Sequence, residues 1–105
     1  MREAGRTAAF FRSLGHPTRV AVIELLSSGE KDVGELTAAI GAQQGRLSSH
    51  LARLRAGGLV VSGPTGRRRL YRVTDPRVQE AVSLARELIR SGAAYIPMCQ
   101  CTQNE

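Results

Sequence analysis

Two short amphipathic stretches separated by a glycine-containing turn constrain the fold of this 105-residue chain more than any other feature. Apolar residues recur at helical spacing in the first stretch until Gly41, and again in the second until the Gly57-Gly58 pair. These positions are Val33, Leu36 and Ile40 in the first stretch and Leu47, Leu51 and Leu54 in the second. The spacing predicts two helices, each with one apolar face. Two such helices joined by a short turn form the helix-turn-helix pattern.

A β-hairpin is predicted directly after this pattern. Residues 59–61 (Leu-Val-Val) predict a strand, and residues 62–66 (Ser-Gly-Pro-Thr-Gly) predict a flexible turn. Residues 67–73 predict a second strand, whose side chains alternate between two faces. Three consecutive arginines lie beside the tip of this hairpin, so it is a candidate wing next to the helix-turn-helix.

Three further helices are predicted around these elements. Residues 3–14 form the first, and the second runs from Pro17 to about Ser27, since proline suits the first turn of a helix. Gly29 is then a candidate left-handed cap. The last helix begins at the cap Asp75-Pro76. The predicted fold class is mainly α with a small β-hairpin, in the order α-α-α-α-β-β-α, which is a winged helix-turn-helix.

The length fits one domain. We expect residues 1–92 to form it and residues 93–105 to be an irregular tail that contains Cys99 and Cys101. Two cysteines so close together cannot form a disulfide that links distant parts of the fold. No apolar run approaches the ~18 residues of a membrane span. The N-terminus lacks the features of a signal peptide, so a cytoplasmic protein is expected. No catalytic constellation can be assembled, and we expect no enzyme activity.

Positive charge is concentrated in one segment. Residues 36–74 contain seven arginines and no Asp or Glu, whereas the whole chain has a formal net charge of +6. The rest of the chain therefore carries a net charge of −1. A field of one sign attracts polyanions over about a Debye length, ~8–10 Å at physiological salt. A basic face that serves only solubility would explain scattered positive charges. It explains less well a run of 39 residues that contains no acidic residue. Nucleic acid is the first partner to consider.

The second helix of a helix-turn-helix enters the major groove with its N-terminal residues at the base edges. Gln pairs with adenine and Arg with guanine, and Ser and His reach bases or phosphates. Arginines on a wing hold phosphates or enter the minor groove. The candidate DNA-binding residues are Gln43, Gln44, Gly45, Arg46, Ser48, Ser49, His50 and Arg53 on the helix, with Arg67, Arg68 and Arg69 on the wing. A merely polar solvent face is the alternative. His50 could also serve helix packing, and His16 is expected to cap or pack.

An ordered series of short motifs resembles the ArsR/SmtB family of winged-helix bacterial regulators. The matching segments are Leu14-Gly-His-Pro-Thr-Arg19, Ile23-Glu-Leu-Leu26, Gly29-Glu30, Val33-Gly-Glu-Leu36, Ser48-Ser-His-Leu51 and Gly58-Leu-Val60, continued by Arg67, Tyr71 and Asp75. The resemblance spans about residues 8–76. It implies a sequence-specific regulator of transcription, usually a repressor, that dimerises through its first and last helices. Many members leave DNA when they bind a metal ion.

Two familiar metal sites of that family are not supported. Its Cys-x-Cys run before the helix-turn-helix aligns with Asp32 and Gly34, and no histidine follows Asp75 for a site on the last helix. Cys99 and Cys101 remain as a tentative metal or metalloid site, because two thiolates at this spacing can chelate one soft ion. An inert pair and a redox switch are the alternatives.

The sequence as a whole predicts a homodimeric DNA-binding repressor with a double-stranded operator as its partner. Release from the operator by a transition-metal or metalloid ion is the expected regulation. A metal-independent or redox-responsive regulator and a winged-helix protein-interaction module remain alternatives.

Overall fold

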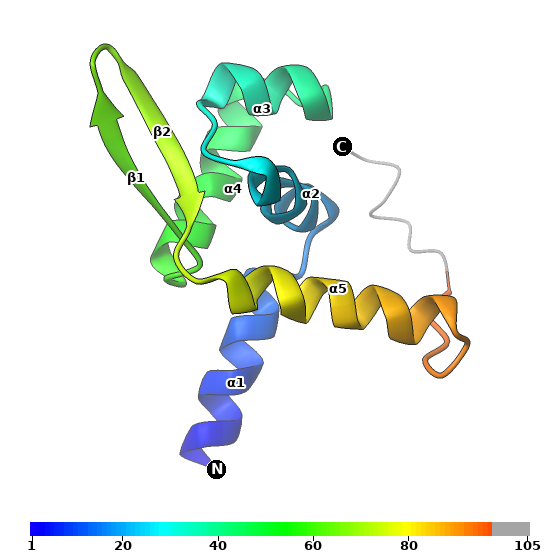
Figure 1. Ribbon diagram of the computed structural model, residues 1–105. Helices are drawn as coiled ribbons and strands as arrows, with labels where there is room; N and C mark the ends of the chain where they lie inside the picture. Colours follow the sequence, from blue (N-terminus) through cyan, green and yellow to red (C-terminus); the bar gives the residue numbers. More distant parts are fainter. Residues whose placement is uncertain (98–105) are drawn as a thin grey trace.

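The computed structural model describes residues 1–97 of the chain. Five α-helices and one β-hairpin follow one another in the predicted order (Figure 1). The helices are α1 (Arg2–Ser13), α2 (Pro17–Leu25), α3 (Val33–Ile40), α4 (Gln44–Ala56) and α5 (Pro76–Arg90). The strands are β1 (Val60–Thr65) and β2 (Arg68–Val73), and a short 3₁₀ turn, Leu26–Ser28, follows α2. The winged helix-turn-helix prediction is confirmed. In this described part, no helix has the length and apolar character needed to cross a membrane.

The helix boundaries coincide with residues that satisfy the free backbone groups at helix ends. His16 and Asp75 are N-caps whose side chains accept the backbone N–H groups of Thr18 and Arg77, and a proline follows each cap. At the end of α3, Gly41 adopts the left-handed conformation with φ 80°. These local signals explain why the predicted helices lie within a residue or two of the observed ones.

Two local predictions were wrong. Residues 62–66 do not form the predicted flexible turn: β1 extends to Thr65, and only Gly66 and Arg67 form the turn. Pro64 is tolerated because, among residues 1–97, β1 pairs only with β2 and its other edge has no partner strand. Gly29 is not a left-handed cap, since its φ of 130° and ψ of 176° belong to an extended conformation that favours glycine.

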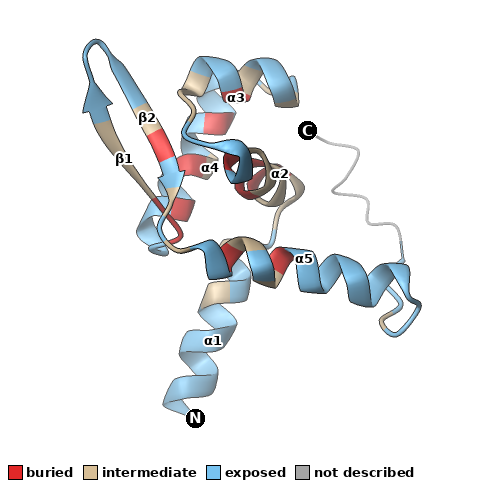
Figure 2. Ribbon diagram, in the orientation of Figure 1, coloured by how far each residue is buried: buried red, intermediate tan, exposed pale blue. Residues whose placement is uncertain are grey.

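The core lies between α2, α3, α4 and the base of the hairpin (Figure 2). All three leucines predicted for the inner face of α4 are at most 1% exposed. The other buried apolar residues include Val22, Ile23, Leu36, Leu59, Val60, Tyr71, Val78 and Val82. By contrast, α1 contributes no buried residue, and the second half of α5 is exposed (Figure 2).

A residue outside the two strands also pairs with the hairpin near its base. The backbone N–H of Lys31 donates to the Tyr71 carbonyl at 3.2 Å, and the Tyr71 N–H donates to the Lys31 carbonyl at 2.8 Å. This bridge ties β2 to the segment just before α3. The tip of the hairpin and α3 lie at the end of the molecule away from α1 (Figure 1).

Candidate DNA-binding surface

Helix α4 presents one apolar and one polar face. Leu47, Leu51 and Leu54 point into the core and fix the rotation of the helix about its axis. The exposed residues among the predicted DNA contacts on or just before α4 are Gln43, Gln44, Gly45, Arg46, Ser48, Ser49 and Arg53. The structure therefore brings seven of these eight predicted residues to the surface. Hydrogen-bond donors and acceptors line this face, as base-edge recognition requires.

The start of α4 is suited to a phosphate group. Gln43 occupies the N-cap position without a side-chain cap bond in the described chain, and the first turn of α4 contains no acidic residue. The N–H groups at a helix start carry partial positive charge and attract anions. Gly45 lies in this turn, and apart from its chain neighbours and the nearby backbone of α4, a methyl group there would meet no described atom within 4 Å. Packing within the chain therefore does not require a glycine at position 45.

His50 is the one predicted α4 residue that is not on the exposed face. Its ring lies 4.2 Å from the His16 ring, centroid to centroid, and its Nδ1 is 3.3 Å from Nη1 of Arg19. Arg19 is buried and also donates to the Arg12 carbonyl at 3.4 Å, so this cluster connects α1, α2 and α4. Of the two roles predicted for His50, its surroundings favour helix packing over contact with DNA. Burial, and then the charge of Arg53, lowers the pKa of Arg19 from its ordinary value.

The predicted wing arginines have different surroundings. Arg67 is exposed in the turn at the hairpin tip. Nη1 of Arg69 donates to the Ser62 hydroxyl at 3.1 Å, and Nη1 of Arg55 from α4 approaches the same oxygen at 3.4 Å. Arg55 and Arg69 therefore place two positive charges side by side where α4 faces the hairpin.

Within residues 1–97, Arg68 alone among the wing arginines is ion-paired. Its Nε lies 2.8 Å from Oδ2 of Asp32, and its Nη2 lies 2.7 Å from Oε1 of Glu35. This pairing offsets its charge and gives Arg68 a different environment from that of Arg67. No pattern in the sequence predicts this pairing with Arg68. Asp32 and Glu35 do have the spacing of a capping box, which is a sequence signal for the start of α3 only.

Exposed apolar side chains gather on α1 and α5, the elements predicted to form a dimer interface. Phe11 is 60% exposed, and Leu84, Leu88 and Ile89 are 45–57% exposed. An apolar groove of about 700 Å³ lies along these helices, with Phe11, Leu14, Val20, Val82 and Ile89 among its lining residues. Contiguous apolar surfaces of this kind mark interaction sites.

Residues 1–97 contain no group of three or more His, Cys, Asp or Glu side chains placed to hold an ion. At the position aligned with the familiar Cys-x-Cys run, the Asp32 carboxylate is committed to the Glu35 backbone N–H and to Arg68. The tentative ligands Cys99 and Cys101 lie outside the described residues.

Comparison with known proteins agrees with this geometry. The sequence profile of the bacterial regulatory protein arsR family matches residues 16–62. A probable mercury resistance operon repressor of Streptomyces lividans is 39% identical over 93 residues, which cover 89% of this chain and 74% of that protein. The crystal structure of Rv0081 from Mycobacterium tuberculosis has a TM-score of 0.80 and 30% identity, covering 89% of this chain and 94% of that one.

The transcriptional repressor BigR from Xylella fastidiosa is a second structural relative. It has a TM-score of 0.76 and 31% identity, and the match covers 84% of this chain and 90% of that one. The described fold, the exposed polar face of α4 and these relatives agree with one another. The chain belongs to the arsR family of bacterial regulatory proteins and is a DNA-binding transcriptional regulator, not an enzyme.

Proposed function

We propose that the chain is a homodimeric repressor that acts in the cytoplasm on a roughly palindromic operator. Two copies of α4 would enter successive major grooves about 34 Å apart. The observation that carries this proposal is the polar row on α4, which its buried leucines orient outward beside an arginine-bearing hairpin. The repressors of S. lividans and X. fastidiosa support the direction of regulation.

Within this surface we assign two roles. The exposed residues at the start of α4 read base edges, with Gln44 suited to adenine and Arg46 to guanine. Arg67 and Arg69 on the wing contact phosphates or the minor groove, which contributes affinity more than specificity. Arg53 lies one turn further along α4 from Ser49, where it can reach the DNA backbone.

The dimer would form through the exposed apolar face of α1 and α5. Phe11 and Ile89 line its groove, and the second copy is the occupant that covers both. Helices α1 and α5 lie away from the hairpin tip (Figure 1), so dimerisation through them would leave both DNA-binding surfaces open.

We further propose that a soft metal or metalloid ion is the effector, held by Cys99 and Cys101. Two thiolates separated by one residue can chelate such an ion, and the S. lividans relative is described as a probable mercury resistance operon repressor. A closed site would need further ligands, for which the second protomer is the natural source.

Binding to duplexes from the region upstream of the gene tests the DNA-reading roles. Arg67→Ala should weaken binding to every duplex and make the salt slope shallower by about 0.9, because one phosphate contact is lost. Arg46→Ala should instead change the order in which operator base substitutions are tolerated. If that order stays the same in Arg46→Ala, α4 does not read bases through this residue. If the protein binds operator and random duplex equally at moderate salt, it is a protein-interaction module and not a sequence-specific regulator.

A further inference from the structure

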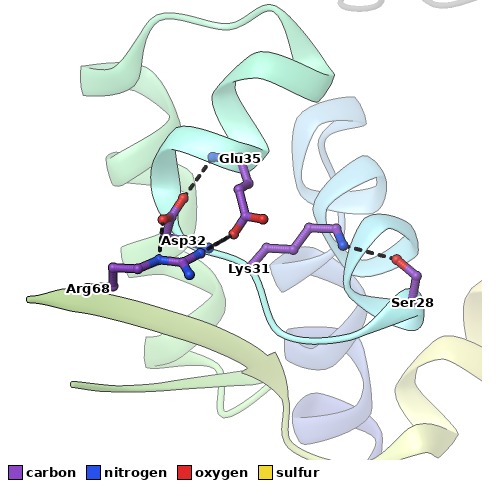
Figure 3. Close-up of polar contacts among 5 residues, drawn as sticks. All are labelled: Ser28, Lys31, Asp32, Glu35 and Arg68. Carbon is purple, nitrogen blue, oxygen red and sulfur yellow. Dashed lines mark hydrogen bonds and ion pairs between the residues drawn. The ribbon is translucent and has the colours of Figure 1, made fainter. Parts of the chain in front are cut away.

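Arg68 reaches across from the wing to the start of α3 (Figure 3). Its guanidinium contacts two carboxylates at once, Oδ2 of Asp32 at 2.8 Å and Oε1 of Glu35 at 2.7 Å. Lys31, which lies next to Asp32 in the chain, directs its ammonium group to the Ser28 hydroxyl at 3.0 Å instead. Arg68, and not the neighbouring Lys31, is therefore the cation that pairs with the two carboxylates.

Both carboxylates also form hydrogen bonds at the start of α3. Oδ1 of Asp32 accepts the Glu35 backbone N–H at 2.8 Å, and Oε1 of Glu35 accepts the Asp32 backbone N–H at 3.0 Å. This reciprocal capping box fixes both side chains at the first turn of α3. The Glu35 N–H and then Arg68 lower the pKa of Asp32 from its ordinary value, so this carboxylate is charged at neutral pH. Arg68 therefore meets acceptors that are already oriented.

The position of this contact along the hairpin matters. The backbone bridge between Lys31 and Tyr71 attaches β2 near its base. Arg68 lies three residues closer to the tip, a distance of about 10 Å at ~3.3 Å per residue. A two-stranded hairpin is only marginally stable by itself. A second attachment near the tip therefore restrains the part of the wing that must meet DNA.

We propose that Arg68 is a positioning residue of the wing and not a ligand of DNA. By pairing with Asp32 and Glu35, it holds the hairpin at a set angle to α3 and hence to α4, so that Arg67 and the recognition helix reach one duplex together. This inference rests on the proposed function, because it assigns a role within the same DNA-binding surface. The Nε and Nη2 atoms of Arg68 are directed at these carboxylates, which offset its charge and hold its guanidinium against α3, so that only its remaining N–H donors face the solvent.

The first test uses the free protein and hydrogen exchange. Arg68→Lys keeps the charge but removes the planar fork that reaches two carboxylates together. We expect the amides of Gly63 and of residues 65–70 to exchange about three- to tenfold faster, since exposed ion pairs restrain a segment only modestly. The core amides of Leu51 and Leu54 should keep their wild-type rates. Arg67→Lys is the matched control and should leave the exchange of the hairpin unchanged. Wild-type exchange of Gly63 and residues 65–70 in Arg68→Lys would overturn the proposal.

The second test is operator affinity as a function of salt. The double substitution Asp32→Asn with Glu35→Gln removes both charges but keeps side chains that can cap α3. We expect it and Arg68→Lys each to weaken binding about three- to tenfold with an unchanged salt slope, because only proteins with a positioned wing bind fully. If the acids instead mask a phosphate ligand, the double substitution will tighten binding and steepen the slope by about 0.9, which overturns the proposal.

The two tests separate this inference from the proposed function. If even the wild-type protein does not prefer its operator, the proposed function fails, while hydrogen exchange still decides whether Arg68 restrains the wing.

Discussion

Replacing Phe11 by alanine should dissociate the proposed dimer without unfolding the protomer. Phe11 is 60% exposed in the single chain although it lines the apolar groove along α1 and α5. Its only ring partner among the described residues is Phe10, at 5.2 Å between ring centroids. The side chain thus contributes little to the core of the protomer, and a second protomer is what would bury it.

The magnitude follows from the exposed area. A phenylalanine of roughly 200 Å² that is 60% exposed leaves about 120 Å² for the partner to cover. At ~25 cal/mol per Å² this is at most about 3 kcal/mol, and about 2 kcal/mol after the area retained by alanine is subtracted. A symmetric dimer loses the side chain twice, so the free energy of dimerisation should become less favourable by about 4 kcal/mol. The dissociation constant should therefore rise several hundred-fold to a thousandfold.

Sedimentation equilibrium over a range of protein concentrations measures this change. Leu70→Ala is the matched control, because it removes an apolar side chain from the hairpin, away from the groove. Circular dichroism should show the same helix content in both variants and in the wild type. A change in dissociation constant below about fivefold, or one equal to that of Leu70→Ala, would refute the assignment of the interface to this face.

Two further outcomes are expected. Gly45→Ala should raise the free energy of unfolding by about 0.5–1 kcal/mol, as Gly5→Ala should in α1, because both positions are helical and open. Only Gly45→Ala should weaken operator binding, and equal affinities for both variants in a fluorescence titration would show that DNA does not approach Gly45 closely. Substituting both Cys99 and Cys101 by Ser should abolish release of the promoter duplex by a soft metal ion while leaving affinity in the absence of metal unchanged. Persistent release at the same metal concentration would remove these cysteines as the sensor.

Local chemistry explains which parts of the fold were predictable. Helix ends depend on neighbours within four residues, so Pro17, Gly41 and the Asp75 cap could be recognised directly. The strand β1 could not be recognised in full, because Gly63-Pro64 is typical of a turn in isolation. Pairing with β2 overrides that preference: Pro64 lies opposite Arg69 in the register of the hairpin.

The candidate DNA-binding surface was predictable to a similar degree. The leucines of α4 recur at helical spacing, so their burial determines which residues of that helix face outward. His50 fits the same polar face by sequence position, yet its ring packs on His16, which lies 34 positions earlier in the chain. No periodicity within one helix reveals a neighbour from another.

The amino-acid sequence by itself determined the order of elements, the apolar face of each helix and the concentration of arginine between residues 36 and 74. These depend on short-range spacing and on composition. Only the tertiary structure decided how those arginines divide. It brings Arg68 to Asp32 and Glu35, more than 30 residues away, and leaves Arg67 at the exposed tip. The physical reason is that charges act through space. Residues 36–74 contain no acidic residue, yet in the folded chain the hairpin lies against α3, and two acidic side chains from just before that segment contact Arg68.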